Sequence, residues 1–463
     1  MTSVDRRRWL KSVVAGACAV AGCGETPASS GDRRRTVIVG GGLAGLALLR
    51  KLVDRGDDAV LLEAGRRLGG RVYTLRDGLP AGLIAEAGAE RVGVGHTRVR
   101  AWLERFGIAC VPPTPPKEPF RLTLGAERHV IADTTEPPAA LLEGLSETER
   151  RFGPFWIDIA FATAIEAPRA DDPRSAMRWM KDAGLGARAE SYVRAFCAHP
   201  LDRIPAVEYH RLAHEDLDAF DWSRIDGGSS RLTDAMSTGL DAFIRRDHVV
   251  DGVWLDGGVL TGGVAGKPAV RCRNGAVFVG DRIVLALPLE PLRKLAFHPE
   301  RPVDLTRRLD GLFASDQVKI HVEIPPIGTG TFSPWNARSA YPRMTWLANG
   351  VAADGRRLMG TMATEVDLVA VRTLLAQGSA AVGAAIAASI ADFPTRTPAA
   401  WFHDFGRDPF AGGSGTYARR GDIPRGPVIT GALGVVGSDL SDMPGWMEGA
   451  LSSVDTLCDA WGI

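Results

Sequence analysis

Two short apolar runs flank a helical pattern near the start of the chain. Thr36 to Val39 is a β-branched run that ends in glycines, and it predicts a buried strand. Leu43 to Arg55 has apolar residues at helical spacing, and Ala59 to Leu62 is a second apolar run. The three elements together predict a βαβ unit of about 30 residues.

Helical and strand-like stretches alternate along the rest of the chain. Residues 120–225 are mixed to helical, with amphipathic stretches over 139–152 and 173–196. The pattern also predicts helices over 97–106, 232–243 and 364–390 and from about residue 445, and strands near 249–254, 269–272, 282–287 and 318–324. This alternation predicts an α/β (α+β) chain in which one domain is interrupted twice by segments of another.

The first residues have the pattern of an export signal. An arginine pair, a tryptophan, a leucine and a lysine lie within residues 5–11, and the apolar stretch over 12–22 is too short to span a bilayer. This arrangement resembles a twin-arginine signal, and residues 20–23 resemble a lipobox ending at Cys23. We expect residues 1–22 to be a signal peptide and 23–34 a linker. The mature chain would then be periplasmic or at the cell surface, lipid-anchored at Cys23; a Sec signal or a plain basic N-terminus are the alternatives.

Composition argues against two classes of function. The 463-residue chain is 45% hydrophobic and 24% charged, with a formal net charge of zero, so it lacks the basic footprint of a nucleic-acid-binding protein. Beyond Cys18 and Cys23 the cysteines are widely spaced, without a zinc-ligand pattern: Cys110, Cys197, Cys272 and Cys458. We expect no metal site and mainly buried thiols, although an oxidising compartment permits one disulfide.

The junction between the first strand and helix has the glycine pattern of a dinucleotide-binding turn. Gly40 permits a tight turn, Gly42 lets backbone amides approach a diphosphate, and Gly45 lets helix and strand pack closely. The helix N-terminus adds a partial positive charge. Glu63 ends the second strand, where a carboxylate can bind ribose hydroxyls. The alternative is a glycine-rich turn that binds no nucleotide.

The residues after this strand indicate FAD. Residues 63–74 match the pattern E-A-x-x-R-x-G-G-R-x-x-T, which resembles the flavin-containing amine oxidase superfamily. Arg67 and Arg71 supply positive charge to the diphosphate and flavin region, and Gly70 allows the chain to pass close to the cofactor. The resemblance implies a Rossmann-like FAD-binding domain of the glutathione-reductase/amine-oxidase type, with a mixed-sheet and helical substrate domain. We assign residues 35–92, 226–300 and 400–463 to the former, and 93–225 and 301–399 to the latter.

The resemblance continues to the C-terminus. Residues 435–439 and 444–450 resemble the closing segment of these oxidases, in which Asp439 would face the ribityl or pyrophosphate side. The following helix would direct its N-terminus at the flavin pyrimidine edge, and the backbone of Val250 would hold adenine. The residues expected around the FAD are Gly40, Gly42, Leu43, Ala44, Gly45, Glu63, Ala64, Arg67, Gly70, Arg71, Gly88, Ala89, Glu90, Arg91, Val250, Asp439, Gly445, Trp446 and Met447.

Two features depart from monoamine oxidases. Ser414 stands where those enzymes carry the cysteine that binds flavin covalently, so the FAD is expected to be non-covalent. Gly415 and Trp446 stand at the two walls of their tyrosine cage, so a standard amine cage is not expected.

The resemblance also implies four catalytic residues. Lys319, on a half-buried strand, stands where these oxidases hold a water near flavin N5; the alternative is a surface lysine. Arg91 stands where L-amino-acid oxidases bind the substrate carboxylate; the alternative is a brace for the flavin loop. Tyr341 would be a second carboxylate ligand, and Trp446, with Trp346, would line the substrate pocket.

The resemblance implies oxidation of an amine carbon, and the expected substrate is an L-amino acid. Hydride would pass to flavin N5, and the imine would hydrolyse to an oxo product and ammonia. Dioxygen is the default acceptor, giving hydrogen peroxide; an exported enzyme could instead reduce a periplasmic cytochrome or quinone. A desaturase, a tetrapyrrole oxidase or a non-catalytic flavoprotein are the other readings, and a homodimer is an open option.

Overall fold

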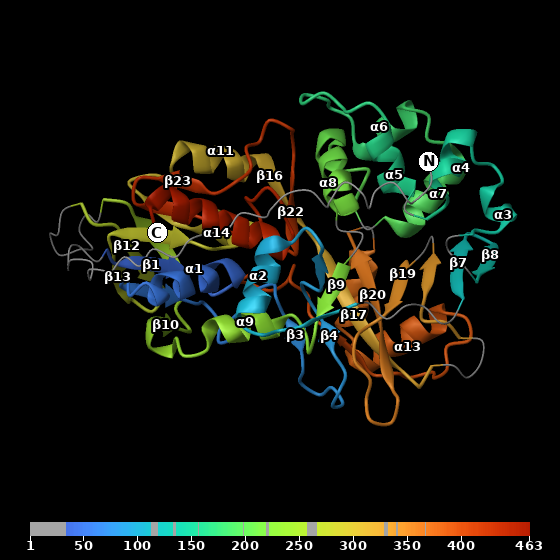
Figure 1. Cartoon of the computed structure of the whole chain (residues 1–463), viewed down its shortest axis with the longest axis horizontal. Helices are drawn as coiled ribbons and strands as arrows, with labels where there is room; N and C mark the ends of the chain where they lie inside the picture. The colour runs from blue at the N-terminus through green and yellow to red at the C-terminus, as the bar shows by residue number, and fades with distance from the viewer. Residues whose placement is uncertain are drawn as a thin grey trace, which may run out of the picture. The chain divides into compact units, whose positions relative to one another are not determined.

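The computed structural model of the chain is shown in Figure 1. It describes residues 34–112, 119–132, 136–155, 157–197, 199–218, 222–256, 266–327, 332–338, 341–365 and 367–463. The predicted signal peptide, Cys18, Cys23 and the linker as far as residue 33 lie outside the described residues.

The predicted βαβ unit is the centre of a six-stranded sheet. The strand order is β10-β2-β1-β14-β24-β23, parallel except for the last pair. The strands are β1 (Thr36–Val39), β2 (Ala59–Leu62), β10 (Ile244–Arg245), β14 (Arg282–Leu285), β23 (Val428–Thr430) and β24 (Leu433–Val435). Three regions far apart in sequence therefore build one sheet.

Both faces of this sheet are covered, which explains its continuous apolar runs. Ile38, Leu61 and Val284 face a core that includes α1 (Leu43–Asp54), α2 (Thr97–Arg105), α9 (Ser230–Ser237) and α14 (Met447–Trp461). The alternate residues, such as Val37 and Ile283, face a second sheet in the order β13-β12-β11-β15. Its strands are β11 (Val250–Trp254), β12 (Ala269–Cys272), β13 (Val277–Val279) and β15 (Ala296–His298).

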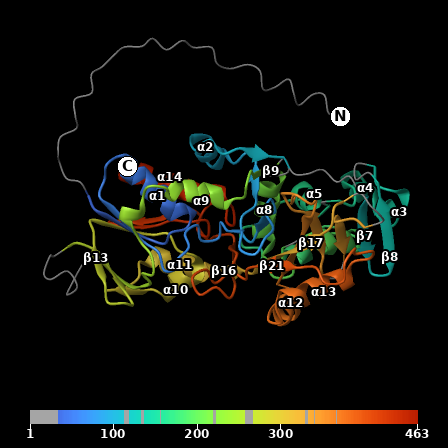
Figure 2. The same cartoon turned by 90° about the horizontal axis from the view of Figure 1, so that it is seen from below.

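A seven-stranded sheet forms the other large layer, in the order β21-β17-β20-β19-β18-β7-β8. Its strands are β7 (Phe120–Leu124), β8 (Glu127–Ile131), β17 (Gln317–Ile324), β18 (Asn336–Arg338), β19 (Met344–Leu347), β20 (Arg357–Thr364) and β21 (Ala400–Phe402). On β17, Val318 and Ile320 pack in a core with α12 (Leu368–Leu375) and α13 (Ser379–Ser389), which lie next to each other in Figure 2. Lys319 and His321 therefore point to the opposite face.

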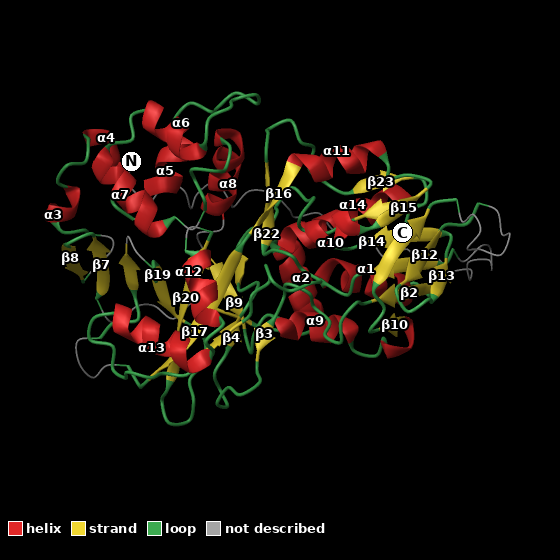
Figure 3. Cartoon of the chain, turned by 180° about the vertical axis from the view of Figure 1, so that it is seen from behind, coloured by secondary structure: helices red, strands yellow, loops and turns green. Residues whose placement is uncertain are grey.

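A group of helices packs against residues of β7, β8 and β18 and lies at the upper left of Figure 3, where all helices are red. The helices are α3 (Ala139–Leu142), α4 (Glu147–Phe152), α5 (Ile157–Ala164), α6 (Ala176–Asp182), α7 (Ala187–Phe196) and α8 (Ala206–Asp218). Short elements connect the layers: β3 (Thr74–Leu75), β4 (Ala85–Glu86), β5 (Arg91–Gly93), β6 (Cys110–Val111), β9 (Trp222–Ile225), η2 (Asp241–Phe243), α10 (Leu289–Lys294), α11 (Val303–Gly311), β16 (Leu312–Ser315) and β22 (Gly415–Ala418).

Four of the predicted helical stretches are each divided in two. The stretch 173–196 holds α6 and α7, and the helix predicted over 232–243 ends with α9 at Ser237 and is followed by the 3-10 helix η2. The stretch 364–390 begins at the end of β20 and then holds two helices, α12 and α13. The stretch 139–152 likewise holds α3 and α4, because Ser146 and Glu149 form a capping box that starts a new helix. The contacts group residues 34–463 as one compact unit, and the domain boundaries stay predictions.

Disulfides, metal sites and membrane-spanning helices can each be looked for among the described residues. Cys110, Cys197, Cys272 and Cys458 are all free thiols, and the last two are buried. In the described ranges no group of three or more His, Cys, Asp and Glu side chains has metal-site geometry. No helix among the described residues is both long and apolar enough to cross a bilayer.

Two glycines of the first turn differ in what surrounds them, and this difference predicts the effect of an added methyl group. A Cβ at Gly45 would lie 1.9 Å from the carbonyl oxygen of Gly40, whereas a Cβ at Gly42 would meet nothing within 4 Å. We expect Gly45→Ala to destabilise the protein by about 2 kcal/mol through overpacking, and Gly42→Ala to unfold at the wild-type temperature. Thermal unfolding of the two variants measures this; equal melting temperatures would contradict the packing.

Candidate active site

A cavity of about 770 Å³ extends along the carboxyl ends of the parallel strands. Its wall includes the residues that follow β1, β2 and β14, which is where ligands bind in open α/β sheets. Of the residues predicted to surround FAD, those in the wall are Gly40, Gly42, Leu43, Ala44, Glu63, Ala64, Arg67, Gly70, Arg71, Gly88, Ala89, Glu90, Arg91, Val250, Gly445, Trp446 and Met447. Lys319 and Trp346 line the same cavity.

The turn after β1 has the form of a phosphate cradle. Gly40 has φ of 106°, a conformation that favours glycine, and the open space at Gly42 lets a phosphate approach the backbone. The carboxylate of Glu63 accepts hydrogen bonds from the N–H groups of Gly41 and Gly65, both at 2.7 Å. Burial raises the pKa of Glu63, although these two amides act in the opposite direction. Glu63 thus holds the glycine turn in place, and the cradle fits a dinucleotide.

Two arginines of the second motif are held differently. Arg67 donates to the carbonyl oxygens of Leu68 and Gly70 at 3.0 and 2.8 Å, and its guanidinium lies 3.9 Å from the centre of the Tyr73 ring. Arg71 forms an ion pair of 2.7 Å with Asp439.

Asp439 and Gly45 are the two predicted FAD neighbours that the cavity wall does not include. Gly45 lies behind the turn, where it permits the close packing described above. Asp439 is 4% exposed, and its second carboxylate oxygen accepts the N–H of Leu289 at 2.8 Å. In this structure the carboxylate acts on the cavity through Arg71, which does line it.

A buried carboxylate holds Lys319 in the cavity wall. The Lys319 ammonium donates to Oε2 of Glu90 at 2.8 Å and to the carbonyl oxygen of Gly88 at 2.9 Å. On the other side, Arg224 donates to Oε1 of Glu90 at 2.9 Å and to Asn349 at 2.8 Å. Burial alone would raise the pKa of Glu90, but the Lys319 and Arg224 cations hold it well below its usual range. Glu90 is therefore an anion that fixes two cations from different strands.

Two further titratable groups lie behind Glu90. Glu86 accepts hydrogen bonds from the Ser229 N–H and the Thr74 hydroxyl, and burial raises its pKa to about 7. Burial lowers the pKa of His321 to about 4, so this imidazole is neutral at pH 7. Both residues line a second cavity of about 10 Å³ together with Glu90. Of these three groups, Glu90 alone is fully charged at neutral pH.

The aromatic residues and Arg91 occupy other parts of the wall. The Arg91 guanidinium lies 4.8 Å from the centre of the Trp222 ring, and both side chains line the cavity. Trp446 also lines it and meets His96 edge to face, with ring centres 4.9 Å apart.

Tyr341 is not among the cavity-lining residues. It packs instead with Val318 and Ile320, on the face of β17 opposite to Lys319. Its buried hydroxyl has no hydrogen-bond partner among the described residues. This position does not support the predicted role as a carboxylate ligand, because the pleat of β17 separates it from the cavity.

Sequence motifs did not predict the far wall of the cavity. It is lined by residues from the helical group and from β22: Asp158, Ile159, Phe196, Cys197, His199, Leu212 and Tyr417. His199 and Tyr417 are joined by a hydrogen bond of 2.9 Å between Nδ1 and the hydroxyl. The closing motif also contains a structural residue, Glu448, whose carboxylate accepts the N–H groups of Arg98 and Val99 at the start of α2.

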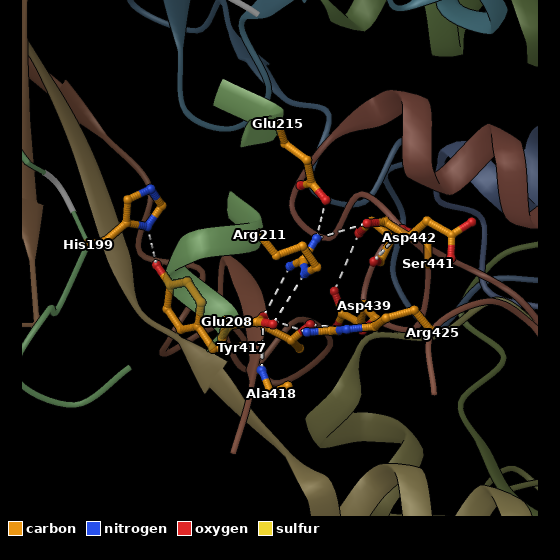
Figure 4. A network of polar contacts seen from close by, with 12 residues as sticks. His199, Glu208, Arg211, Glu215, Tyr417, Ala418, Arg425, Asp439, Ser441 and Asp442 are labelled. Carbon is orange, nitrogen blue, oxygen red and sulfur yellow. Dashed lines mark hydrogen bonds and ion pairs between the residues drawn. The ribbon is translucent and has the colours of Figure 1, made fainter. Parts of the chain in front are cut away.

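A polar network attaches α8 to the C-terminal part of the chain (Figure 4). Glu208 accepts hydrogen bonds from Arg211 at 3.1 Å, from Arg425 at 2.5 Å and from the N–H of Ala418 at 3.0 Å. Arg425 also donates to the carbonyl oxygen of Asp439. The helix that contributes to the far wall is thus fixed to the segment that carries Arg71's partner.

Comparisons with known protein families, sequences and structures all identify flavin-dependent amine oxidases as similar proteins. The model for the flavin containing amine oxidoreductase family matches residues 43–454. (S)-6-hydroxynicotine oxidase of Paenarthrobacter nicotinovorans is 25% identical over 468 residues, which cover 92% of this chain and 98% of that enzyme. L-amino acid oxidase of Cerastes cerastes is 40% identical over 75 residues, covering 16% of this chain and 14% of that enzyme. The structure of a putrescine oxidase matches with a TM-score of 0.75 and 19% identity, covering 93% of this chain and 99% of that one.

Replacing Glu90 should reveal how much it stabilises the site. Glu90→Gln leaves the Lys319 and Arg224 cations together without their anion, so we expect a loss of about 3 kcal/mol in the free energy of unfolding. Chemical denaturation measures this. Glu127→Gln, which breaks a surface ion pair with Arg188, is the matched control and should change nothing measurable. Equal stability of the two variants would show that Glu90 does not support the site.

Proposed function

We propose, because this chain belongs to the flavin containing amine oxidoreductase family, that it oxidises a small amine at the carbon bonded to the nitrogen. The observation that carries the proposal is the position of Lys319. Its ammonium is fixed by Glu90 and by the Gly88 carbonyl oxygen in the wall of the cavity that also contains the Gly42 turn. The glycine turn that would hold the nucleotide and the fixed Lys319 cation thus line the same cavity.

The FAD would be held without a covalent bond. Gly42 and Glu63 would take the diphosphate and the ribose, with Arg71 adding positive charge, and Ser414 in the wall cannot form a thioether. When bound, FAD supplies the acceptor for a hydride from the amine carbon, which leaves an imine for hydrolysis to an oxo product and, from a primary amine, ammonia. Dioxygen is the proposed final acceptor, giving hydrogen peroxide; a periplasmic cytochrome or quinone is the alternative.

The charges around Lys319 favour a neutral amine at this end of the cavity. Lys319 and Arg224 carry two positive charges against the one negative charge of Glu90. Burial raises the pKa of Glu86 to about 7, so it adds only part of a negative charge. Like charges disfavour an ammonium group. The site therefore promotes the unprotonated amine, whose lone pair assists departure of the hydride.

Two substrate classes remain candidates. One relative that matches over 92% of this chain is named for 6-hydroxynicotine, an amine without a carboxylate, which supports a simple amine as substrate. The second candidate, an L-amino acid, is supported by the Arg91 guanidinium in the cavity wall and by the short match to an L-amino acid oxidase. In that case Arg91 would bind the substrate carboxylate.

Anaerobic bleaching of the flavin band distinguishes the two classes. We expect amines without a carboxylate to bleach the flavin of the wild-type protein and of Arg91→Ala at similar rates. If the substrate is an L-amino acid, Arg91→Ala should weaken its binding roughly tenfold to a hundredfold, because a charge-assisted hydrogen bond is lost. An absence of bleaching by both panels, in protein that retains FAD, would contradict amine oxidation.

We further propose that the chain is exported and lipid-anchored, on the pattern of residues 6–11 and Cys23. Arg6→Lys together with Arg7→Lys should leave most of the protein in the cytoplasmic fraction, since the twin-arginine route requires the pair. Cys23→Ala should release an otherwise exported protein from membranes. Cell fractionation followed by immunoblotting measures both; unchanged fractionation of both variants would contradict the proposal.

A further inference from the structure

A second buried carboxyl group lies behind Glu90 without a cation of its own. Glu86, on β4, is buried and takes part in none of the ion pairs between described residues. Its Oε1 accepts a hydrogen bond of 2.6 Å from the Ser229 N–H, and its Oε2 lies 3.0 Å from the Thr74 hydroxyl oxygen. Both partners are uncharged. Because a buried carboxylate without a cation is costly, these surroundings favour the carboxylic acid.

The Thr74 hydroxyl can serve both charge states of this carboxyl group. Its oxygen accepts the N–H of Ser230, at the start of α9, at 3.0 Å. A hydroxyl both donates and accepts, so Thr74 can donate to the Glu86 carboxylate or accept a hydrogen bond from the acid. Glu86 can therefore gain or lose a proton while its hydrogen-bond partners stay in place.

The two cations of this cluster bind Glu90 and not Glu86. Lys319 donates to Oε2 of Glu90, and Arg224 donates to Oε1. Burial raises the pKa of Glu86 to about 7; Glu90 adds to this effect, whereas the Ser229 N–H and the Lys319 ammonium oppose it. The charges of Glu86, Glu90 and Lys319 are thus close enough to act on one another.

The other groups around Glu86 do not change charge near neutral pH. The polar side chains that line the small second cavity are Glu86, Glu90, Arg224, His321 and Asn349. His321 is neutral, because burial lowers its pKa to about 4, and Asn349 is uncharged. Arg76, which follows β3, donates to the carbonyl oxygen of Gly227. Among these groups, Glu86 is the one that titrates close to pH 7.

The net charge beside Lys319 therefore depends on one proton. While Glu86 holds that proton, Lys319 and Arg224 outweigh Glu90 by one positive charge. Ionisation of Glu86 cancels this excess. Lys319 and Glu90 line the main cavity, whereas Glu86 does not. Glu86 thus acts on a bound molecule through the charge of its neighbours and not by contact.

We propose that Glu86 is a positioning residue of this site, a buried acid whose ionisation removes the net positive charge beside Lys319. This inference rests on the proposed amine oxidation and adds its regulation by pH. The proton passes between the Glu86 carboxyl group and bulk water, and no bond to a substrate forms. With Glu86 ionised, the cavity disfavours an ammonium ion less, so a bound amine keeps its own proton to a higher pH.

The first test is the pH dependence of stability in Glu86→Gln. The amide keeps the shape and both hydrogen-bonding contacts of the acid, but it cannot ionise. The folded wild type holds the Glu86 proton to about pH 7, whereas the unfolded chain loses it near pH 4.5, so wild-type stability falls as pH rises between these values. We expect the wild-type melting temperature to fall by roughly 2 °C or more relative to the variant over this range.

The second test is the reduction potential of bound FAD, which requires no amine. Glu63, Arg71 and Lys319 line one cavity, so FAD held there experiences the charge beside Lys319. Negative charge accumulates on a flavin when it is reduced, and a lower positive charge nearby makes reduction less favourable. We expect the wild-type potential to fall relative to that of Glu86→Gln as pH rises through about 7.

Two further variants accompany these measurements. Thr74→Val removes the hydroxyl that donates to the carboxylate but keeps Glu86, so both transitions should move to higher pH. Glu147→Gln is the matched control, because it makes the same chemical change at an exposed carboxylate paired with Arg151. Its differences from the wild type should not vary with pH.

Anaerobic bleaching connects the inference to the proposed reaction. The FAD-loaded protein is mixed with an amine that bleaches it, and the limiting rate is measured from about pH 6 to about pH 10. We expect this rate to reach half its maximum at a lower pH in Glu86→Gln than in the wild type, by about half to one pH unit, because the variant keeps the positive charge that disfavours ammonium. A purely structural role would lower the rate without moving the profile.

The outcomes separate this inference from the proposed function. A stability difference that does not vary with pH would show that Glu86 holds no buried proton and would overturn the inference. A pH-dependent stability difference without a matching change in potential, or with equal midpoints of the bleaching profiles, would overturn the action of Glu86 on the cavity. Matching changes in stability and potential, with no bleaching by any amine, would support the charge switch and overturn amine oxidation.

Discussion

Glu90 is a buried carboxylate that binds two cations from separate parts of the chain. Arg224 is on β9, which pairs with β5 directly after Glu90, and Lys319 is on β17 of the seven-stranded sheet. A buried anion needs cationic partners, so Glu90 fixes β9 and β17 relative to the segment that borders the cavity. The position of the Lys319 ammonium, and with it the chemistry proposed for the cavity, depends on this carboxylate.

The same electrostatics set the charge beside the proposed reacting nitrogen. Lys319 and Arg224 carry two positive charges against the one negative charge of Glu90, and this excess favours a neutral amine. The network centred on Glu208 joins the helix beside Asp158 to the segment that positions Arg71. The residues proposed to hold the cofactor and the residues of the far wall are therefore connected by one polar network. A ligand long enough to span the cavity contacts both.

Local patterns made much of the cofactor side predictable. The βαβ unit over 36–62 and the motif over 63–74 are contiguous, so periodicity and glycine positions identify them. Lys319 was identified from the resemblance to amine oxidases, at a polar position of a strand that alternates apolar and polar residues. Arg224 and Asp158 were not, because tertiary packing brings Arg224 to Glu90 and Asp158 to the cavity wall, and no short motif surrounds either residue. Tyr341 was assigned from the resemblance to L-amino-acid oxidases, but it packs on the face of β17 opposite to Lys319 and does not line the cavity.

The central claim is that breaking a C–H bond next to an amine nitrogen reduces the flavin held in this cavity. The most direct measurement is anaerobic rapid mixing of the FAD-loaded protein with an amine that bleaches it, in ordinary form and deuterated at the carbon bonded to nitrogen. The account predicts that the limiting rate of bleaching falls several-fold with deuterium, because hydride transfer from that carbon is the reducing step. Bleaching of the flavin precedes product release, so slow release of the product does not affect the measured rate. Identical bleaching rates for the two forms would therefore contradict the account.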